Sequence, residues 1–273
     1  MMIPWRAPFL EKLVRPDAVR SAVAGWLGAV GRAADALVFP WSCAVCGAEG
    51  TGGAFCPSCR AALLEHSATA TAWACPRCAL PAGPYADLRG GCGDCRGRSL
   101  GFEAAIALGP YDGTLRELCL RMKHDRDAWL APWLCGLWVE ARGEAVDRLS
   151  LPPDAWVVPV PLHWRRHWER GYNQAEALAR GLARKLDRPV RRPLRRVAAT
   201  RKLAELSATD RAKALRRAFR ARKSSGLKGR TILLVDDVLT TGATCGAAAR
   251  ALRRAGAKRV IVAVIARTGK TTQ

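Results

Sequence analysis

Long hydrophobic runs are missing from this sequence of 273 residues. No stretch approaches the roughly 18 unbroken apolar residues that a membrane-spanning helix needs. The best candidate, residues 22–31, is interrupted by glycines and stops at Arg32, so we expect no membrane span. Glu11 and Asp17 stand where a secretory signal would carry positive charge. We therefore also expect no export signal and a cytoplasmic location.

Acidic residues are scarce. The sequence has 23 Asp and Glu against 45 Lys and Arg, which gives a net charge of +22. This imbalance predicts attraction to polyanions or phosphorylated small molecules, but it does not specify a fold. An apolar share of 49% with 25% charged residues excludes wholesale disorder.

The excess positive charge is concentrated in the second part of the chain. Residues 1–100 carry 10 basic and 7 acidic side chains, whereas residues 184–230 carry 18 basic and 3 acidic ones. A solvated helix face accounts for scattered arginines, but a run this dense repels itself unless an anion lies nearby. We therefore expect an anion-facing surface in this region.

Cysteine is plentiful, and eight of the eleven cysteines form four Cys-x-x-Cys pairs. These pairs are Cys43/Cys46, Cys56/Cys59, Cys75/Cys78 and Cys92/Cys95. Two such knuckles complete a tetrahedral Zn²⁺ site. A redox motif does not explain four pairs, and a disulfide framework needs an oxidising compartment that no export signal supports. We predict two structural Zn²⁺ sites, and the spacing leaves open which knuckles share an ion.

Composition divides the chain into three expected segments. Residues 1–38 form an N-terminal amphipathic helical segment, because apolar residues recur at helical spacing between Val19 and Leu37. Residues 39–100 hold the knuckles among many glycines and prolines, with few large apolar residues, so bound metal must supply their folding energy. Residues 101–273 read as an α/β domain.

Apolar runs and helical periodicities alternate in this last segment. We expect strands at residues 104–108, 156–160, 231–235 and 259–265, and helices at residues 113–123, 172–186 and 243–254. The last strand, helix and strand predict a parallel pair joined by a crossover. Sheets of this kind bind ligands at the carboxyl ends of their strands.

Residues 235–244 read Val-Asp-Asp-Val-Leu-Thr-Thr-Gly-Ala-Thr and follow one of these strands. We expect Asp236 and Asp237 at the strand end, where carboxylates suit sugar hydroxyls and Mg²⁺. The turn then leads into a helix N-terminus, whose N–H groups and dipole favour a phosphate, and Gly242 permits close backbone approach. A plain turn with capping threonines is the alternative, which the complete arrangement disfavours.

This segment resembles the 5-phosphoribosyl-1-pyrophosphate (PRPP) loop of type I phosphoribosyltransferases, in which a hydrophobic strand and two acids precede Thr-Thr-Gly-x-Thr. The resemblance implies a type I phosphoribosyltransferase-like α/β fold, a parallel sheet with flanking helices. It places Asp236 and Asp237 on the ribose hydroxyls. The residues that it places around the 5′-phosphate are Thr240, Thr241, Gly242, Ala243 and Thr244.

The chain from about Phe39 to Arg267 resembles the ComF family, which places a double zinc ribbon ahead of a phosphoribosyltransferase domain. The segments that carry this likeness are Phe39-Pro40-Trp41-Ser42-Cys43, Val158-Pro159-Val160-Pro161-Leu162, Arg170-Gly171-Tyr172-Asn173-Gln174, and the stretch from Leu194 to Phe219. The sequence departs from the family pattern at Leu203 and Ala214, where the family has Gln and Asn.

The same resemblance implies a set of basic residues around the diphosphate. Arg170 is the candidate catalytic contact beside the two acids, because a guanidinium fork matches phosphate oxygens. The further candidate diphosphate ligands are Arg165, Arg166, Arg195 and Arg196. Lys123 is expected near the cleft.

Two functions follow as hypotheses. The first is a PRPP-binding protein that uses Mg²⁺ and transfers or senses the phosphoribosyl group, with the acceptor and turnover left open. The second comes from the ComF resemblance, which implies a part in natural competence: binding of single-stranded DNA, with competence-machinery proteins as partners and PRPP as a regulator. The basic run, the ribbons and the tryptophans at 156, 164 and 168 fit a groove with stacking platforms.

Overall fold

The computed structural model describes residues 42–162, 171–197, 218–222 and 226–269. The expected N-terminal helical segment and the basic stretch at residues 198–217 lie outside these ranges. The chain divides into two compact units, one ending at Cys56 and the other beginning at Pro57. Among the described helices, none is long and apolar enough to cross a membrane.

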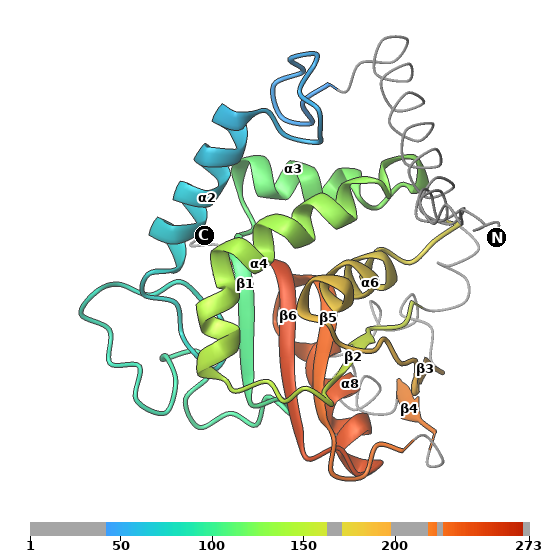
Figure 1. Ribbon diagram of the computed structural model, residues 1–273. Helices are drawn as coiled ribbons and strands as arrows, with labels where there is room; N and C mark the ends of the chain where they lie inside the picture. Colours follow the sequence, from blue (N-terminus) through green and yellow to red (C-terminus); the bar gives the residue numbers. More distant parts are fainter. Residues whose placement is uncertain (1–41, 163–170, 198–217, 223–225, 270–273) are drawn as a thin grey trace, which may run out of the picture. The chain divides into compact units, whose positions relative to one another are not determined.

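The second unit is built on a four-stranded parallel sheet with the strand order β1-β6-β5-β2 (Figure 1). A two-stranded antiparallel hairpin, β3-β4, lies apart from this sheet. In chain order the elements are α2 (Pro57–Thr71), β1 (Ala104–Pro110), α3 (Gly113–Arg121), the 3-10 helix η1 (Asp125–Asp127), α4 (Leu130–Arg148), β2 (Trp156–Pro159), α6 (Gln174–Leu186), β3 (Leu194–Arg196), β4 (Phe219–Ala221), β5 (Thr231–Leu239), α8 (Ala243–Arg254) and β6 (Arg259–Arg267). The α/β class and the parallel sheet expected from the sequence are confirmed.

The two central strands, β5 and β6, are apolar along most of their length because helices cover both faces of the sheet. Here the structure corrects an expectation, since β5 does not end at Val235 before the two acids. It continues to Leu239, with Asp236 paired to Val264 and Val238 paired to Ala266. The nine-residue partner β6 offers ladder hydrogen bonds along this whole length, so the acids lie within the strand.

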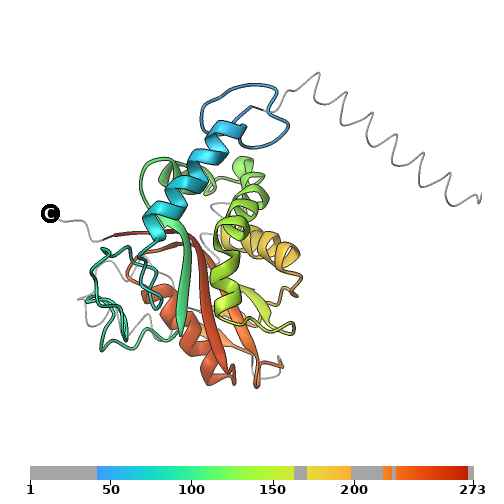
Figure 2. The same cartoon turned by 60° about the vertical axis from the view of Figure 1, so that its left-hand side comes forward.

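Helices α4 and α6 pack together and contact β1, β2 and β5, whereas α8 contacts β5, β6 and the β3-β4 hairpin. Turned by 60°, the molecule shows these two groups of helices on opposite faces of the sheet (Figure 2). Helix α6 begins where Asn173 caps it, its side-chain oxygen accepting from Ala175 N–H at 3.1 Å. Its buried face includes Leu178 and Leu182, as the periodicity predicts.

Several described elements have no counterpart among the sequence-based expectations: α2, η1, α4 and the β3-β4 hairpin. Helix α4 buries Leu130, Leu134 and Trp138, and the Trp138 indole N–H donates to the Val264 carbonyl at 3.0 Å. Helix α2 contacts β1, where the Ser67 hydroxyl donates to the Leu108 carbonyl. Helices α2 and α4 therefore cover the β1 side of the sheet.

Candidate functional site

The second pair of knuckles forms a compact Cys₄ cluster. Four sulfurs about 2.3 Å from one Zn²⁺ lie roughly 3.8 Å apart in a tetrahedron. The Sγ atoms of Cys75 and Cys95 are 3.6 Å apart, those of Cys78 and Cys92 are 3.5 Å apart, and those of Cys92 and Cys95 are 3.8 Å apart. All four side chains are buried together with Leu80, Leu88 and Leu100 around them. The cluster therefore has the dimensions of a zinc ribbon site.

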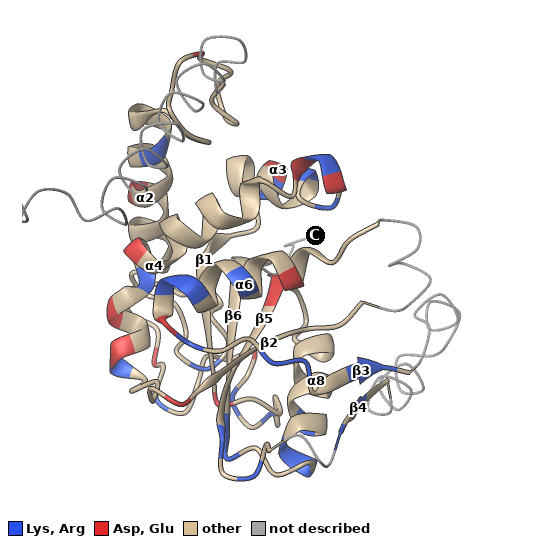
Figure 3. Ribbon diagram, turned by 45° about the vertical axis from the view of Figure 1, so that its right-hand side comes forward, with Lys and Arg blue, Asp and Glu red and all other residues tan. Residues whose placement is uncertain are grey.

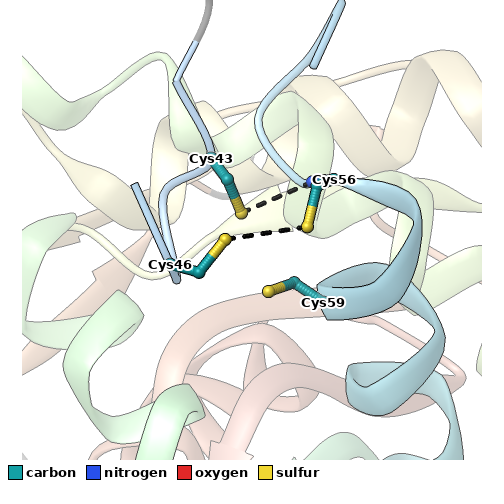
Figure 4. Close-up of side chains that lie close together, drawn as sticks. All are labelled: Cys43, Cys46, Cys56 and Cys59. Atoms are coloured by element: carbon teal, nitrogen blue, oxygen red, sulfur yellow. Dashed lines mark hydrogen bonds between the residues drawn. The ribbon is translucent and has the colours of Figure 1, made fainter. Parts of the chain in front are cut away.

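The first two knuckles form a second Cys₄ cluster, with the sulfurs of Cys43, Cys46, Cys56 and Cys59 turned toward one centre (Figure 4). Their ligand atoms lie within 4.8 Å of one another, and the sulfurs of Cys46 and Cys56 are 3.8 Å apart. Neighbouring knuckles therefore share a site, which resolves the pairing that spacing alone leaves open. Both predicted zinc sites fit the geometry.

Backbone N–H groups favour the thiolate form of one cysteine in each cluster. Burial opposes ionisation of Cys43, but N–H groups including those of Cys46 and Cys56 outweigh it and lower its pKa to about 6. Burial likewise opposes ionisation of Cys75, and N–H groups including that of Cys92 lower its pKa to about 7. Thiolates are the form that binds metal, so the local backbone supports the same assignment.

A pocket of about 290 Å³ lies where β1, β2 and β5 end. Its lining combines acids, hydroxyls, cations and an amide. The lining residues are Tyr111, Lys123, Val160, Pro161, Leu162, Gln174, Arg196, Asp236, Asp237, Val238, Thr240 and Thr244. This is the position at which open parallel sheets bind ligands.

The two acids are held differently inside this pocket. Gln174 Nε2 donates to Asp237 Oδ2 at 3.0 Å, and Val238 N–H donates to Asp237 Oδ1 at 2.8 Å. Asp236 Oδ1 accepts from Asp237 N–H at 3.0 Å, and its Oδ2 lies 3.7 Å from the Cys245 sulfur. Burial of the Asp236 carboxyl and the neighbouring charge of Asp237 raise its pKa well above the ordinary value. A hydroxyl donor or a cation at this point would relieve that repulsion.

The turn between β5 and α8 leads into a helix N-terminus, as the sequence predicts. Gly242 has φ +76°, a left-handed conformation that glycine adopts without steric cost. Thr241 Oγ1 accepts from Ala243 N–H at 3.3 Å, so these residues shape the turn. Thr240 and Thr244 line the pocket, whereas Thr241, Gly242 and Ala243 are not among its lining residues.

Comparison with known proteins gives the family. The family model of the phosphoribosyl transferase domain matches residues 172–273, and that of the double zinc ribbon domain matches residues 34–96. The chain is 33% identical over 198 residues to the DNA utilization protein YhgH of Salmonella typhi, covering 71% of this chain and 84% of that one. The chain belongs to the ComF family.

The chain is also similar to two further proteins. Competence protein F of Haemophilus influenzae is 33% identical over 178 residues, 64% of this chain and 78% of that protein. Adenine phosphoribosyltransferase of Rhodococcus jostii is 55% identical over 42 residues, which is 15% of this chain and 24% of that enzyme. This chain thus joins a double zinc ribbon to a phosphoribosyltransferase-type domain.

The cations expected around the site divide into three groups. Lys123 and Arg196 line the pocket. Arg195 is exposed on β3 and is not among the lining residues. Arg165, Arg166 and Arg170 lie outside the described residues, so the structure does not place them.

Sequence reasoning did not assign Gln174, Tyr111 or Arg267 to the site. Gln174 was part of a family segment, but only its burial beside Asp237 shows its contact with the acids. Its Oε1 atom is buried and has no hydrogen-bond partner among the described residues. That oxygen is free to accept from a ligand.

Buried Arg267 connects the second Cys₄ cluster to the turn between β5 and α8. Its Nε donates to the Cys78 carbonyl at 2.9 Å, and its Nη1 donates to the carbonyls of Leu239, at 3.0 Å, and Thr240. The guanidinium therefore holds together a cysteine ligand's backbone and the start of the turn. It ends β6 only 9% exposed, a position that nothing in the local sequence singles out.

Proposed function

We propose that this ComF-family protein binds PRPP with Mg²⁺ and transfers or senses the phosphoribosyl group. The observation that carries the proposal is one pocket that joins Asp236 and Asp237 to the threonines of a helix-opening turn and to two cations. Paired acids suit a ribose diol, and the turn suits a phosphate. The unpaired Gln174 oxygen adds an acceptor beside the acids.

Each group has a defined task in this proposal. Asp236 and Asp237 accept hydrogen bonds from the ribose hydroxyls, and Thr240 and Thr244 bind the 5′-phosphate at the N-terminus of α8. Lys123 and Arg196 offset the charge of the diphosphate, aided by the arginines at 165, 166 and 170. Asp236 and Asp237 are the lining residues that would hold Mg²⁺, and the ion would neutralise charge on the diphosphate.

Catalysis of transfer would rest on positioning and electrostatics rather than on a nucleophilic side chain. The bond from C1 of the ribose to the diphosphate oxygen breaks, and the diphosphate leaves with the electron pair. A nitrogen nucleophile then forms the new bond to C1. Release of diphosphate with candidate acceptors separates turnover from sensing.

Calorimetry with PRPP and Mg²⁺ tests the binding step. We expect the Asp236→Asn/Asp237→Asn variant to bind at least about 100-fold more weakly, because two charge-assisted contacts are lost. Asp147→Asn, on the exposed end of α4, is the matched control and should bind normally. Equal affinity of the native chain and the double variant would refute this site.

As a second candidate function we propose binding of single-stranded DNA in the cytoplasm, in competence or DNA use. The relatives' names refer to competence and DNA utilization. The structural observation is the β3-β4 hairpin, where Arg195 and Arg220 are exposed and directly paired across the strands. Like charges in this position destabilise a hairpin unless an anion lies between them, and basic residues colour both strands (Figure 3).

The candidate stacking platform is Trp156, at the start of the edge strand β2. The guanidinium groups of Arg191 and Arg230 each lie 5.7 Å from the centre of the Trp156 ring. Aromatic rings flanked by cations suit nucleic-acid bases and phosphates. An oligonucleotide titration at two salt concentrations tests this function: binding that weakens steeply with salt supports it, and no binding at low salt refutes it.

A further inference from the structure

A second cavity, of about 460 Å³, lies away from the acid-lined pocket and shares no lining residue with it. It is formed by the end of α2, the second zinc ribbon, β1 and α4. Its walls are mostly apolar, with Leu88 from the ribbon, Ile106 from β1 and Leu149 after α4, together with several alanines. A cavity of this size with few polar groups is typical of a small-molecule site.

The charged groups at this cavity are all of one sign. Arg142 and Arg148, both on α4, line it, and no carboxylate does. Neither guanidinium forms an ion pair within the part of the chain that the structure describes. Arg148 is exposed at the end of α4, whereas Arg142 is partly buried. A partly buried cation at an apolar wall without an acid lacks the partner that such charges require.

Arg142 is held in place but not fully satisfied. Its Nη2 donates to the carbonyl of Ser67 at 2.8 Å and to the hydroxyl of Ser67 at 2.6 Å. Its Nε is buried and has no hydrogen-bond partner among the described residues. Burial, followed by the nearby charge of Arg148, lowers its pKa. Arg142 therefore keeps one buried donor that the described residues leave unpaired.

Strand β1, which forms part of the cavity wall, is an edge strand of the sheet. On β1, Glu103 and Tyr111 donate their N–H groups to β6, so alternation directs the intervening even-numbered residues to the outer edge. Leu108 follows this rule, since its carbonyl accepts from Ser67 on that edge. Ile106, which lines the cavity, has the same orientation.

We propose that this cavity binds a small organic anion, an oxyanion carried on a compact apolar body. The carboxylate or phosphate group would accept from Arg142 and Arg148, whose planar forks suit such oxyanions. The apolar body would cover Leu88, Leu149 and the alanines. A neutral alkyl compound would leave the arginines unpaired, and a bare inorganic ion would leave the apolar wall in water. The site is independent of the PRPP proposal.

Calorimetry on the full zinc-bound chain tests the site with four probes: octanoate, phenyl phosphate, octanol and inorganic phosphate. We expect octanoate or phenyl phosphate to bind with one-to-one stoichiometry, and the better of the two identifies the oxyanion. Octanol and inorganic phosphate should bind at least about tenfold more weakly, because octanol lacks the oxyanion and inorganic phosphate lacks the apolar body.

Two variants distinguish this cavity from the rest of the surface. Arg148→Gln should weaken the better probe by about fivefold, as expected for a partly exposed charged contact. Ala145→Leu, on α4 at the cavity wall, should prevent binding by filling the space. Arg254→Gln, in the last turn of α8, is the matched control for Arg148 and should bind normally.

The outcomes are separable. The proposal is overturned if neither organic anion binds, if octanol binds as well as octanoate, or if both cavity variants bind like the native chain. Arg196→Gln, which alters the acid-lined pocket, should leave octanoate binding unchanged. A loss with Arg196→Gln but not with Arg148→Gln would place the probe in the other pocket and refute the proposal.

Discussion

The carboxyl group of Asp236 is an ionisable group that the fold holds in an unfavourable environment. Its removal from water and the adjacent charge of Asp237 raise its pKa. A raised pKa means that the folded chain binds this proton more tightly than the unfolded chain does. Its effect is therefore absent below about pH 4, the ordinary range of aspartate, and stability falls as pH rises through the interval up to the raised pKa.

We predict that Asp236→Asn raises the free energy of unfolding at pH 7 and gives a gain that shrinks toward pH 4. The amide keeps the shape of the side chain and removes the buried negative charge. Substitutions that relieve strain at a functional site commonly stabilise the fold. Urea denaturation at a series of pH values in Mg²⁺-free buffer measures the gain. Exposed Asp147→Asn should show no such pH dependence, and a variant less stable than the native chain at pH 7 would contradict the prediction.

The sequence predicts the residues of the site whose chemistry is written in a local motif, and misses those brought in by the fold. Asp236, Asp237, Thr240 and Thr244 belong to one segment, and all four line the pocket. Tyr111 follows a different strand, and it reaches the pocket because β1 and β5 end at the same edge of the parallel sheet. The spacing of residues in a single sequence does not predict that Tyr111 lies beside the two acids.

The ends of helices and strands can be predicted from the sequence only where local residues mark them. The bounds of α8 agree with the expectation because an apolar face, a glycine before it and two arginines in its last turn mark both ends. The end of β5 does not, because a pair of acids reads as a strand terminus while the long partner β6 continues the ladder to Leu239. Strand β3 has only three residues and pairs with β4 across residues 198–217, so local alternation is too short to reveal it.

Arg267 joins two elements that the sequence treats as separate domains. We predict that Arg267→Met weakens PRPP binding by about tenfold or more, because the carbonyls of Leu239 and Thr240 lose the donor that fixes the turn. It should also lower the free energy of unfolding by about 2–4 kcal/mol, since buried acceptors are left unpaired. Calorimetry and urea denaturation measure the two effects.

A control at the opposite end of the same strand separates positioning from general stability. Arg259 binds Glu103 through two nitrogens, Nε and Nη2, and donates to the Leu149 carbonyl at 3.0 Å. Arg259→Met should lose stability without changing PRPP affinity. If both variants change affinity equally, Arg267 has only a structural role; if Arg267→Met binds PRPP normally, the link between ribbon and turn is wrong.

At the scale of the whole molecule, we expect the zinc ribbons to depend on bound metal for stability and the sheet domain to depend on its apolar core. Residues 72–100 contribute few large apolar side chains, and their buried cluster consists of four cysteines with three leucines around it. We predict two Zn²⁺ per chain, falling to one in Cys78→Ser, because a three-cysteine site loses a thiolate ligand. Zinc release measured with a chromophoric chelator counts the ions.

The remaining core predicts what happens when the metal is removed. The parallel sheet and its helices bury their own apolar cluster, which includes Val158, Leu234 and Val262. Chelation should therefore unfold the ribbons while most of the helical circular dichroism persists. Complete loss of helical signal would show that the sheet domain depends on zinc, and retention of two ions in Cys78→Ser would contradict the site.

The net charge of +22 gives the last prediction, which concerns long-range electrostatics. Each phosphate of a single strand neutralised by a cation makes log K against log salt steeper by about 0.7. Arg195→Gln/Arg220→Gln should therefore make the slope for an oligonucleotide shallower by about 1.4, because the proposed function puts two phosphates on this exposed pair. Arg253→Gln/Arg254→Gln, exposed on α8, removes the same net charge and should leave the slope nearly unchanged. Equal slopes for the two variants would mean that net charge alone attracts DNA, whereas a smaller slope for the hairpin variant alone would locate the contact on β3 and β4.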